Sequence, residues 1–128
     1  MEFIKDAVAW VEIPVIDFSR AKAFYEAIYD YEMQEMEMGP FRMGFLLHDR
    51  ETNGVGGAIC LGEGHTPSGH TGPKLYLNGG EDLDVVLNRV VGAGGKVSMP
   101  KVEIAPDMGY MAFFEDTEGN IIGLHSMG

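Results

Sequence analysis

With 128 residues, 45% of them hydrophobic, the chain has the size and composition of one globular domain, which excludes a disordered protein. Its formal net charge of −11 would repel phosphate backbones and anionic membranes, so we expect neither a nucleic acid nor a membrane partner. The single cysteine, Cys60, excludes an internal disulfide, and no apolar run has the length of a secretory signal or a membrane span, so we expect a cytoplasmic protein.

The regular pattern begins with a β-strand. Residues 8–15 alternate in polarity, and alternate residues of a strand point to opposite faces. The face that we expect in the core carries Val11, Ile13 and Val15. The opposite face, which we expect to line a cleft or an edge, carries Trp10, Glu12 and Pro14.

A helix and three strands complete the first half. Asp17 or Ser19 can cap a helix whose apolar stripe has the spacing i, i+3, i+4, i+7 and consists of Ala21, Phe24, Tyr25 and Ile28. Strands are expected at 31–38, 41–48 and 58–61, with a turn at 39–40 and a loop over 49–57.

The glycine-rich residues 62–73 predict a linker, and beyond it the same order begins again. A strand at 75–77 precedes a helix that Asp82 can cap, and strands follow at 96–104, 110–115 and 121–125. The apolar face of this second helix consists of Leu83, Val86, Leu87, Val90 and Val91. We therefore predict one α+β domain (residues 1–128) of two βαβββ modules, about 7–61 and 74–126, whose curved mixed sheets form a shared cleft.

The stretch Met108–His125 predicts a β-hairpin. An apolar run over 110–114 meets a polar turn over 116–120, and a second apolar run follows over 121–124. Asp116 can accept hydrogen bonds from backbone amides, and Gly119 and Asn120 tolerate a positive φ.

Three stretches carry a family pattern: I-P-V-I-D-F-S-R-A-K-A-F-Y-E (13–26), D-L-D-V-V-L-N-R-V-V-G-A-G-G-K-V (82–97) and F-E-D-T-E-G-N-I-I-G-L (114–124). In this order and spacing they resemble the vicinal-oxygen-chelate superfamily, which includes glyoxalase I, extradiol dioxygenases and bleomycin resistance proteins. The resemblance covers essentially the whole chain. It implies a small-molecule cleft and a homodimer, in which the linker is where modules would be exchanged.

The resemblance also implies a divalent-metal site, built from His, Glu or Gln side chains on the first and last strand of each module. The corresponding positions hold Trp10, Cys60, Lys74 and Gly123. An indole, an ammonium and a glycine do not bind a hard cation, and only Cys60 offers a soft ligand. We therefore expect no metal at these positions and no other cofactor, while a metal held by other residues stays possible.

Strand alternation would place Glu12 and His125 in the same cleft. They are candidate catalytic residues, as an acid–base couple, or two ligands of a displaced metal site. The alternative interpretation is a partly exposed strand carboxylate and a fraying C-terminal histidine. Cys60 is either a small buried hydrophobe or a nucleophile. The remaining histidines are expected to be surface or loop residues: His48, His65 and His70.

The candidate ligand-binding residues are Trp10, Cys60, Lys74, Tyr76, Met111 and Phe113. Trp10 either fills core space or offers a flat surface for stacking. Two functions stay open: a glyoxalase-like lyase acting on a small metabolite, and a metal-free protein that sequesters a small hydrophobic or aromatic compound, as bleomycin resistance proteins do. Metal-independent catalysis by Glu12 and His125 is a third.

Overall fold

The computed structural model describes the backbone of residues 1–128 and every side chain except that of Met38. The elements in order are β1 (Trp10–Pro14), α1 (Phe18–Tyr29), β2 (Glu35–Met38), β3 (Phe41–Phe45), β4 (Gly56–Leu61), β5 (Tyr76–Asn78), α2 (Asp84–Leu87), β6 (Lys96–Ala105), β7 (Gly109–Glu115) and β8 (Ile121–Ser126). Among the residues described, no helix combines the length and the hydropathy needed to cross a lipid bilayer.

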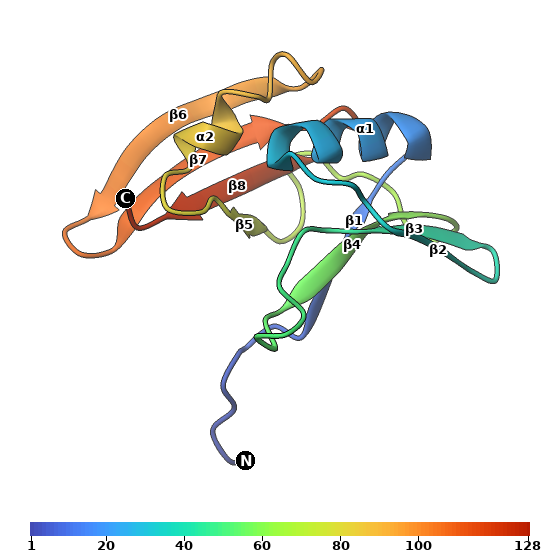
Figure 1. Cartoon of the computed structure of the whole chain (residues 1–128), viewed down its shortest axis with the longest axis horizontal. Helices are drawn as coiled ribbons and strands as arrows, with labels where there is room; N and C mark the ends of the chain where they lie inside the picture. The colour runs from blue at the N-terminus through green and yellow to red at the C-terminus, as the bar shows by residue number, and fades with distance from the viewer.

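The strands form a first sheet with the order β1-β4-β3-β2 and a second sheet with the order β5-β8-β7-β6 (Figure 1). In each sheet the first strand of the module pairs in parallel with the last, and the other neighbours are antiparallel. This arrangement confirms the predicted α+β fold of two βαβββ modules.

The second helix is much shorter than its apolar pattern predicts. After α2 the backbone continues as turns, with bonds from the Arg89 amide to the Val86 carbonyl and from the Val90 amide to the Leu87 carbonyl. Such i to i−3 bonds are tighter than those of an α-helix. Val91, predicted to be buried, is 67% exposed, because the chain has left the helical path before reaching it.

Strand boundaries differ from the prediction mainly around β4. This strand begins at Gly56, inside the expected loop, because it pairs with the whole of β1, from Trp10 opposite Gly56 onward. A side chain at Gly57 would collide with Val11, so the glycine allows the two strands to lie close together. Residues 31–34 and 46–48, predicted as strand, lie outside the two sheets.

One hydrophobic core lies between the two sheets, and α1 fills it. Ile13 and Ile59 enter this core from the first sheet, and Phe114 and Leu124 enter it from the second. Phe24 of α1 packs on Phe114 of β7, with ring centroids 5.8 Å apart. Each sheet therefore turns one face toward the helix-filled core and its other face away from it.

The β7–β8 turn fastens the second sheet to the start of α1. The Glu118 carboxylate accepts hydrogen bonds from the amides of Ile16 and Asp17, at 2.8 and 2.7 Å, and from the Arg20 guanidinium at 2.7 Å. Its side chain is 0% exposed. Burial alone would raise the pKa of Glu118, but the Arg20 bond and the backbone amides outweigh it and lower the pKa to about 2.

Asp116 extends this clamp into the core. One of its carboxylate oxygens accepts bonds from the amides of Glu118 and Asn120, and the other accepts the Tyr25 hydroxyl at 2.7 Å. Asn120 in turn donates to the Pro14 carbonyl at 2.8 Å. The predicted turn is confirmed, with Gly119 at φ 87°, and its polar residues hold the two modules together.

The position of the core determines where the side chains of Trp10 and Tyr76 lie. Trp10 and Tyr76 lie on the faces turned away from the core and are 42% and 45% exposed. Among the described side chains, no aromatic contact, hydrogen bond or ion pair joins these two faces. Both faces therefore point away from the core that α1 fills, and the groove between the modules has Lys74 and Tyr76, but not Trp10, among its lining residues.

We predict that Glu118→Gln lowers the free energy of unfolding by about 2–3 kcal/mol at pH 7, because it weakens charge-assisted bonds to Arg20 and two amides. The folded pKa of Glu118, about 2, lies below its ordinary value of 4.5, so its stabilisation is complete above pH 4.5 and disappears as the pH falls toward 2. The difference between wild type and variant should shrink over that range in denaturant titrations.

Glu115→Gln is the matched control. Glu115 lies on β7 and forms an exposed ion pair with Lys96 at 3.8 Å, which should contribute less than about 1 kcal/mol. Equal destabilisation by Glu118→Gln and Glu115→Gln would contradict the stabilising role assigned to the Glu118 hydrogen bonds.

Candidate functional site

The outward face of the first sheet, here called the Trp10 face, is largely apolar. Cross-strand pairing places the following side chains on it: Trp10, Glu12, Met43, Phe45, Ala58 and Cys60. The Trp10 ring meets Phe45 edge to face across β4, with centroids 6.2 Å apart. The Arg50 guanidinium lies 5.3 Å from the centre of the Phe45 ring. Trp10 is 42% exposed and so does not fill core space, and its role as a stacking surface stays a prediction.

A polar cluster interrupts this apolar face. Glu12 accepts a hydrogen bond from the Trp10 indole at 3.2 Å, and its other oxygen lies 2.8 Å from Nε2 of His65. Cys60 completes the group, in which one ligand atom from each of Glu12, Cys60 and His65 lies within 4.8 Å of the others. The Nδ1 atom of His65 is buried and has no hydrogen-bond partner among the described residues.

The environment shifts the pKa values of Glu12 and Cys60 in opposite directions. The hydrogen bond to His65 lowers the pKa of Glu12, so this carboxylate is ionised at neutral pH. Burial, together with the nearby charge of Glu12, raises the pKa of Cys60 to about 12. Without a cation beside it, Cys60 therefore stays a buried, protonated thiol at neutral pH.

The outward face of the second sheet, here called the Tyr76 face, repeats the aromatic arrangement. Its side chains are Lys74, Tyr76, Met111, Phe113, Ile121 and His125, with Gly123 among them. Tyr76 meets Phe113 with centroids 5.3 Å apart, and the Lys74 ammonium lies 5.3 Å from the Phe113 ring centre. Linker residues 69–74 border a cavity of about 220 Å³ on this face, next to Phe113 and Ile121.

The two predicted catalytic residues are not brought together. Glu12 pairs with His65 on the Trp10 face, whereas His125 lies on the Tyr76 face with Nε2 3.0 Å from the Met108 carbonyl. His125 does not fray, because it lies within β8 opposite Met111. Their catalytic roles stay predictions, and the structure offers no Glu12–His125 couple.

The four positions of the family metal site do not fit a metal. Trp10 and Lys74 offer no ligand atom to a cation at neutral pH, and Cys60 alone is insufficient. Gly123 is covered by Tyr76, since a Cβ atom there would lie 2.5 Å from the Tyr76 ring. A carboxylate side chain at position 123 would have to displace that ring. A metal ligand at this position and the present Tyr76–Phe113 contact therefore exclude each other.

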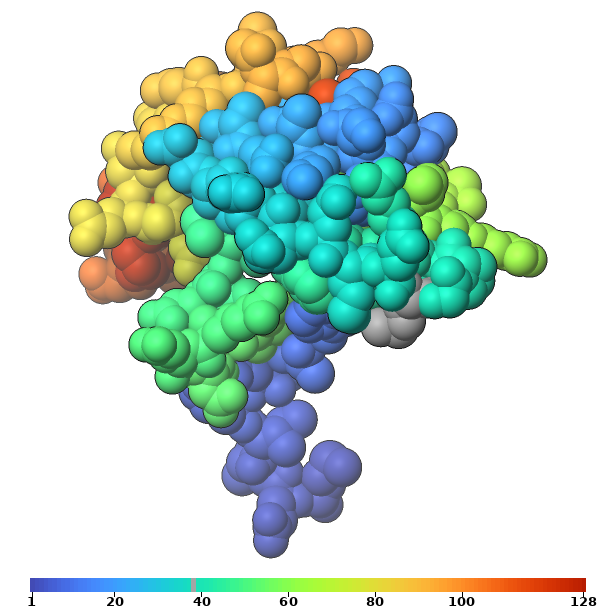
Figure 2. Space-filling view, turned by 45° about the vertical axis from the view of Figure 1, so that its right-hand side comes forward, coloured from blue at the N-terminus to red at the C-terminus, as the bar shows by residue number. Residues whose placement is uncertain are grey.

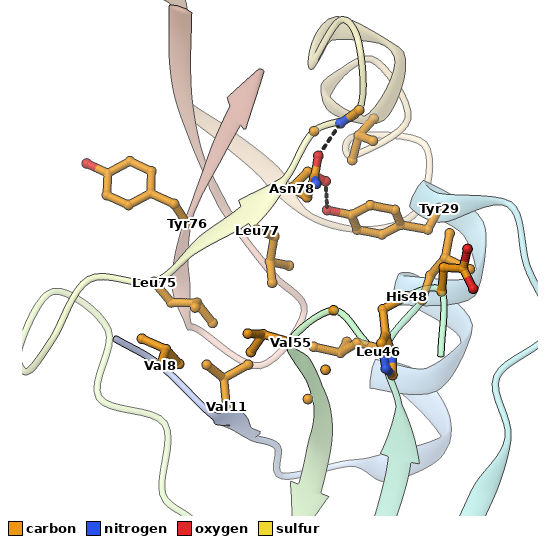
Figure 3. Close-up of a pocket in the computed structure, with 18 of the residues that line it drawn as sticks. Val8, Val11, Tyr29, Leu46, His48, Val55, Leu75, Tyr76, Leu77 and Asn78 are labelled. Atoms are coloured by element: carbon orange, nitrogen blue, oxygen red, sulfur yellow. Dashed lines mark hydrogen bonds between the residues drawn. The ribbon is translucent and has the colours of Figure 1, made fainter. Parts of the chain in front are cut away.

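A groove of about 1270 Å³ lies between the modules, next to the core, and its lining includes Lys74 and Tyr76 of the Tyr76 face. Figure 3 shows Val11, Leu46 and Val55 of the first module directed into the same space as Leu75 and Leu77 of the second. At its edge the Tyr29 hydroxyl donates to the Asn78 carbonyl at 2.8 Å. Figure 2 shows the N-terminal residues projecting from the body of the molecule, and the groove lining includes Lys5–Val8.

Sequence reasoning missed two residues of the Trp10 face. His65 was predicted to be a loop residue without a role, but it packs against Phe41 with ring centroids 5.5 Å apart and bonds Glu12. Arg50 was not singled out. The sequence signal for His65 was weak, because a loop that folds back onto a sheet leaves no periodic pattern.

Comparison with known proteins shows to which family the chain belongs. Residues 7–124 match the profile of the "Glyoxalase/Bleomycin resistance protein/Dioxygenase superfamily". A relative from Mycobacterium tuberculosis, CFP32, is named as a candidate glyoxylase and is 29% identical over 126 residues, covering 96% of this chain and 46% of that protein. The chain thus spans about half the length of the curated relatives it first matches.

Solved structures share the fold. A glyoxalase/bleomycin resistance protein from Streptomyces sp. CB03234 is 26% identical, with a TM-score of 0.66 over 91% of this chain and 97% of that chain. TnmS3 from the same organism, named as an antibiotic binding protein, is 23% identical, with a TM-score of 0.64 over 99% of this chain and 100% of that chain. By its sequence match and its two βαβββ modules, the chain belongs to the glyoxalase/bleomycin resistance protein/dioxygenase superfamily.

Proposed function

We propose that this chain binds a planar aromatic small molecule that carries negative charge, and that a homodimer provides the binding site. The observation that carries this proposal is an aromatic pair that both sheets repeat. In each sheet, an aromatic ring on the edge strand crosses the neighbouring strand, which has small residues there. It contacts a phenylalanine on the third strand. The pairs are Trp10 with Phe45 and Tyr76 with Phe113.

The charges on these faces support an anionic ligand. The chain has 9 basic against 20 acidic residues, yet each aromatic pair has a cation beside its phenylalanine. Arg50 accompanies Phe45 and Lys74 accompanies Phe113, both at 5.3 Å. A planar anion stacked on either pair would lie within reach of a positive charge.

The exposure of the two faces supports a site formed by two copies of the chain. Each face alone is open to water, and a small-molecule site usually encloses most of its ligand. The Trp10 face of one copy meeting the Tyr76 face of another would enclose a ligand between two aromatic pairs. The apolar groove between the modules adds exposed surface that association would cover. A cytoplasmic location stays a prediction.

A glyoxalase-like lyase reaction is the second candidate. It is favoured by the 29% identical relative whose name points to a glyoxylase, and by the Glu12–His65 contact, which could transfer a proton. Turnover of a glyoxalase substrate that is lost in Glu12→Gln would establish this reaction. Ligand binding without turnover would establish the first proposal.

We predict that the protein binds 1-naphthoate more tightly than 1-naphthalenemethanol, which has the same rings and no charge. Lys74→Gln and Arg50→Gln should each weaken naphthoate binding roughly two- to fivefold, the effect of losing one exposed cation near an aromatic ring. The affinity for the alcohol should change little. Isothermal titration calorimetry of both compounds gives the comparison.

Lys96→Gln is the charge control, since Lys96 is 82% exposed and lies on β6, outside both aromatic pairs. If it weakens naphthoate binding as much as Lys74→Gln does, the effect comes from the net charge of the chain, and the proposed role of Lys74 is wrong.

We predict that Gly123→Ala reduces naphthoate affinity while leaving the thermal unfolding midpoint within a few degrees of wild type. The new methyl group would push the Tyr76 ring off Phe113, and Tyr76 contributes little to the core because it is exposed. Gly54→Ala is the control, since a methyl group there meets no atom closer than 3.9 Å. Unchanged affinity in Gly123→Ala would exclude Tyr76 from the site.

A further inference from the structure

We infer that Glu12, Cys60 and His65 form a binding site for a transition-metal dication of the Zn²⁺ type, which shares only Cys60 with the four positions of the family metal site. The inference goes beyond the proposed ligand binding and stands independently of it. It rests on three donor atoms of different chemistry that two strand residues and one linker residue bring together on the Trp10 face.

The donor set suits such a cation in both type and spacing. Ligand atoms of the three side chains lie within 4.8 Å of one another, and one pair is already at 2.8 Å. Zinc binds carboxylate oxygen and imidazole nitrogen at about 2.0–2.2 Å and thiolate sulfur at about 2.3 Å, so side-chain rotations of small amplitude would close the site. Mixed sulfur, nitrogen and oxygen donors disfavour Mg²⁺ and Ca²⁺.

The surroundings of the three residues are arranged as for a metal site. The Trp10 indole donates to one oxygen of Glu12 and leaves the other directed at His65. His65 is held by the Phe41 ring, and its Nδ1 is buried without a partner among the described residues. The Nε2 atom that faces Glu12 is the one that would bind the dication, whereas Nδ1 lies on the other side of the ring and would not be a ligand of the same ion.

Charge balance also favours a dication. Binding of a dication would release the Cys60 proton, because the ligand is the thiolate, and the ion would then neutralise the charges of Glu12 and Cys60 beside a neutral imidazole on an otherwise apolar face. Three protein ligands leave a fourth position of a tetrahedral metal for water or a ligand heteroatom. Because Trp10 contacts Glu12, that position would lie next to the proposed stacking surface.

The test uses the full chain, stripped of metal and titrated with Co²⁺ as a spectroscopic substitute for Zn²⁺. We expect one Co²⁺ per chain, visible d–d bands of a tetrahedral site and a thiolate-to-cobalt charge-transfer band, all removed by added Zn²⁺. Cys60→Ala should abolish the charge-transfer band. Glu12→Gln and His65→Gln should each weaken Zn²⁺ binding by at least the roughly 10–100-fold typical for loss of a second-shell partner.

His70→Gln is the matched control, because His70 lies in the same linker and is exposed. Glu12 and His65 are on the surface side of the cluster, so their variants should fold even if Cys60→Ala does not, and thermal unfolding checks this. The inference is overturned if Co²⁺ binding shows no charge-transfer band, or if His70→Gln weakens binding as much as His65→Gln. Naphthoate binding, measured separately without metal, would be unaffected by either failure.

Discussion

The arrangement of this molecule depends on a buried carboxylate at a hairpin turn. Glu118 accepts the free amides at the entrance to α1 and pairs with Arg20, and so fixes the first module's helix against the second module's sheet. Replacing water around a buried carboxylate requires such a set of donors. Asp116 and Tyr25 make a second connection of this kind, five residues after Arg20. With α1 held between the sheets, both aromatic faces must point outward.

That outward orientation links the fold to the proposed function. Trp10 and Tyr76 each make their aromatic contact within their own sheet, and they are 42% and 45% exposed. The two faces are chemically alike, each with an aromatic pair and a cation. A ligand could therefore be sandwiched when two copies of the chain meet. The same constraint separates Glu12 from His125 and leaves Glu12 to His65.

Much of the fold was predictable from the sequence, because period-two strands, the stripe of α1 and the turn over 116–120 are local patterns. The end of α2 and the start of β4 were not, since i to i−3 bonds and the pairing of Gly56 with Trp10 are decided by tertiary contacts. The outward residues of each strand were predicted well by alternation. Their partners were not: that His65 folds back onto Glu12, and that α1 separates the two faces, depends on packing between distant segments.

The most direct measurement of the central claim is subunit mixing. In the proposed homodimer, Trp10→Ala chains alone and Tyr76→Ala chains alone would each have both sites damaged. After the two variants are unfolded and refolded together, a mixed dimer should contain one site with both an intact Trp10 face and an intact Tyr76 face. The account predicts that calorimetry then detects naphthoate binding of wild-type affinity, which neither variant shows alone. No recovery in verified mixed dimers would mean that each site belongs to a single chain, which would contradict the account.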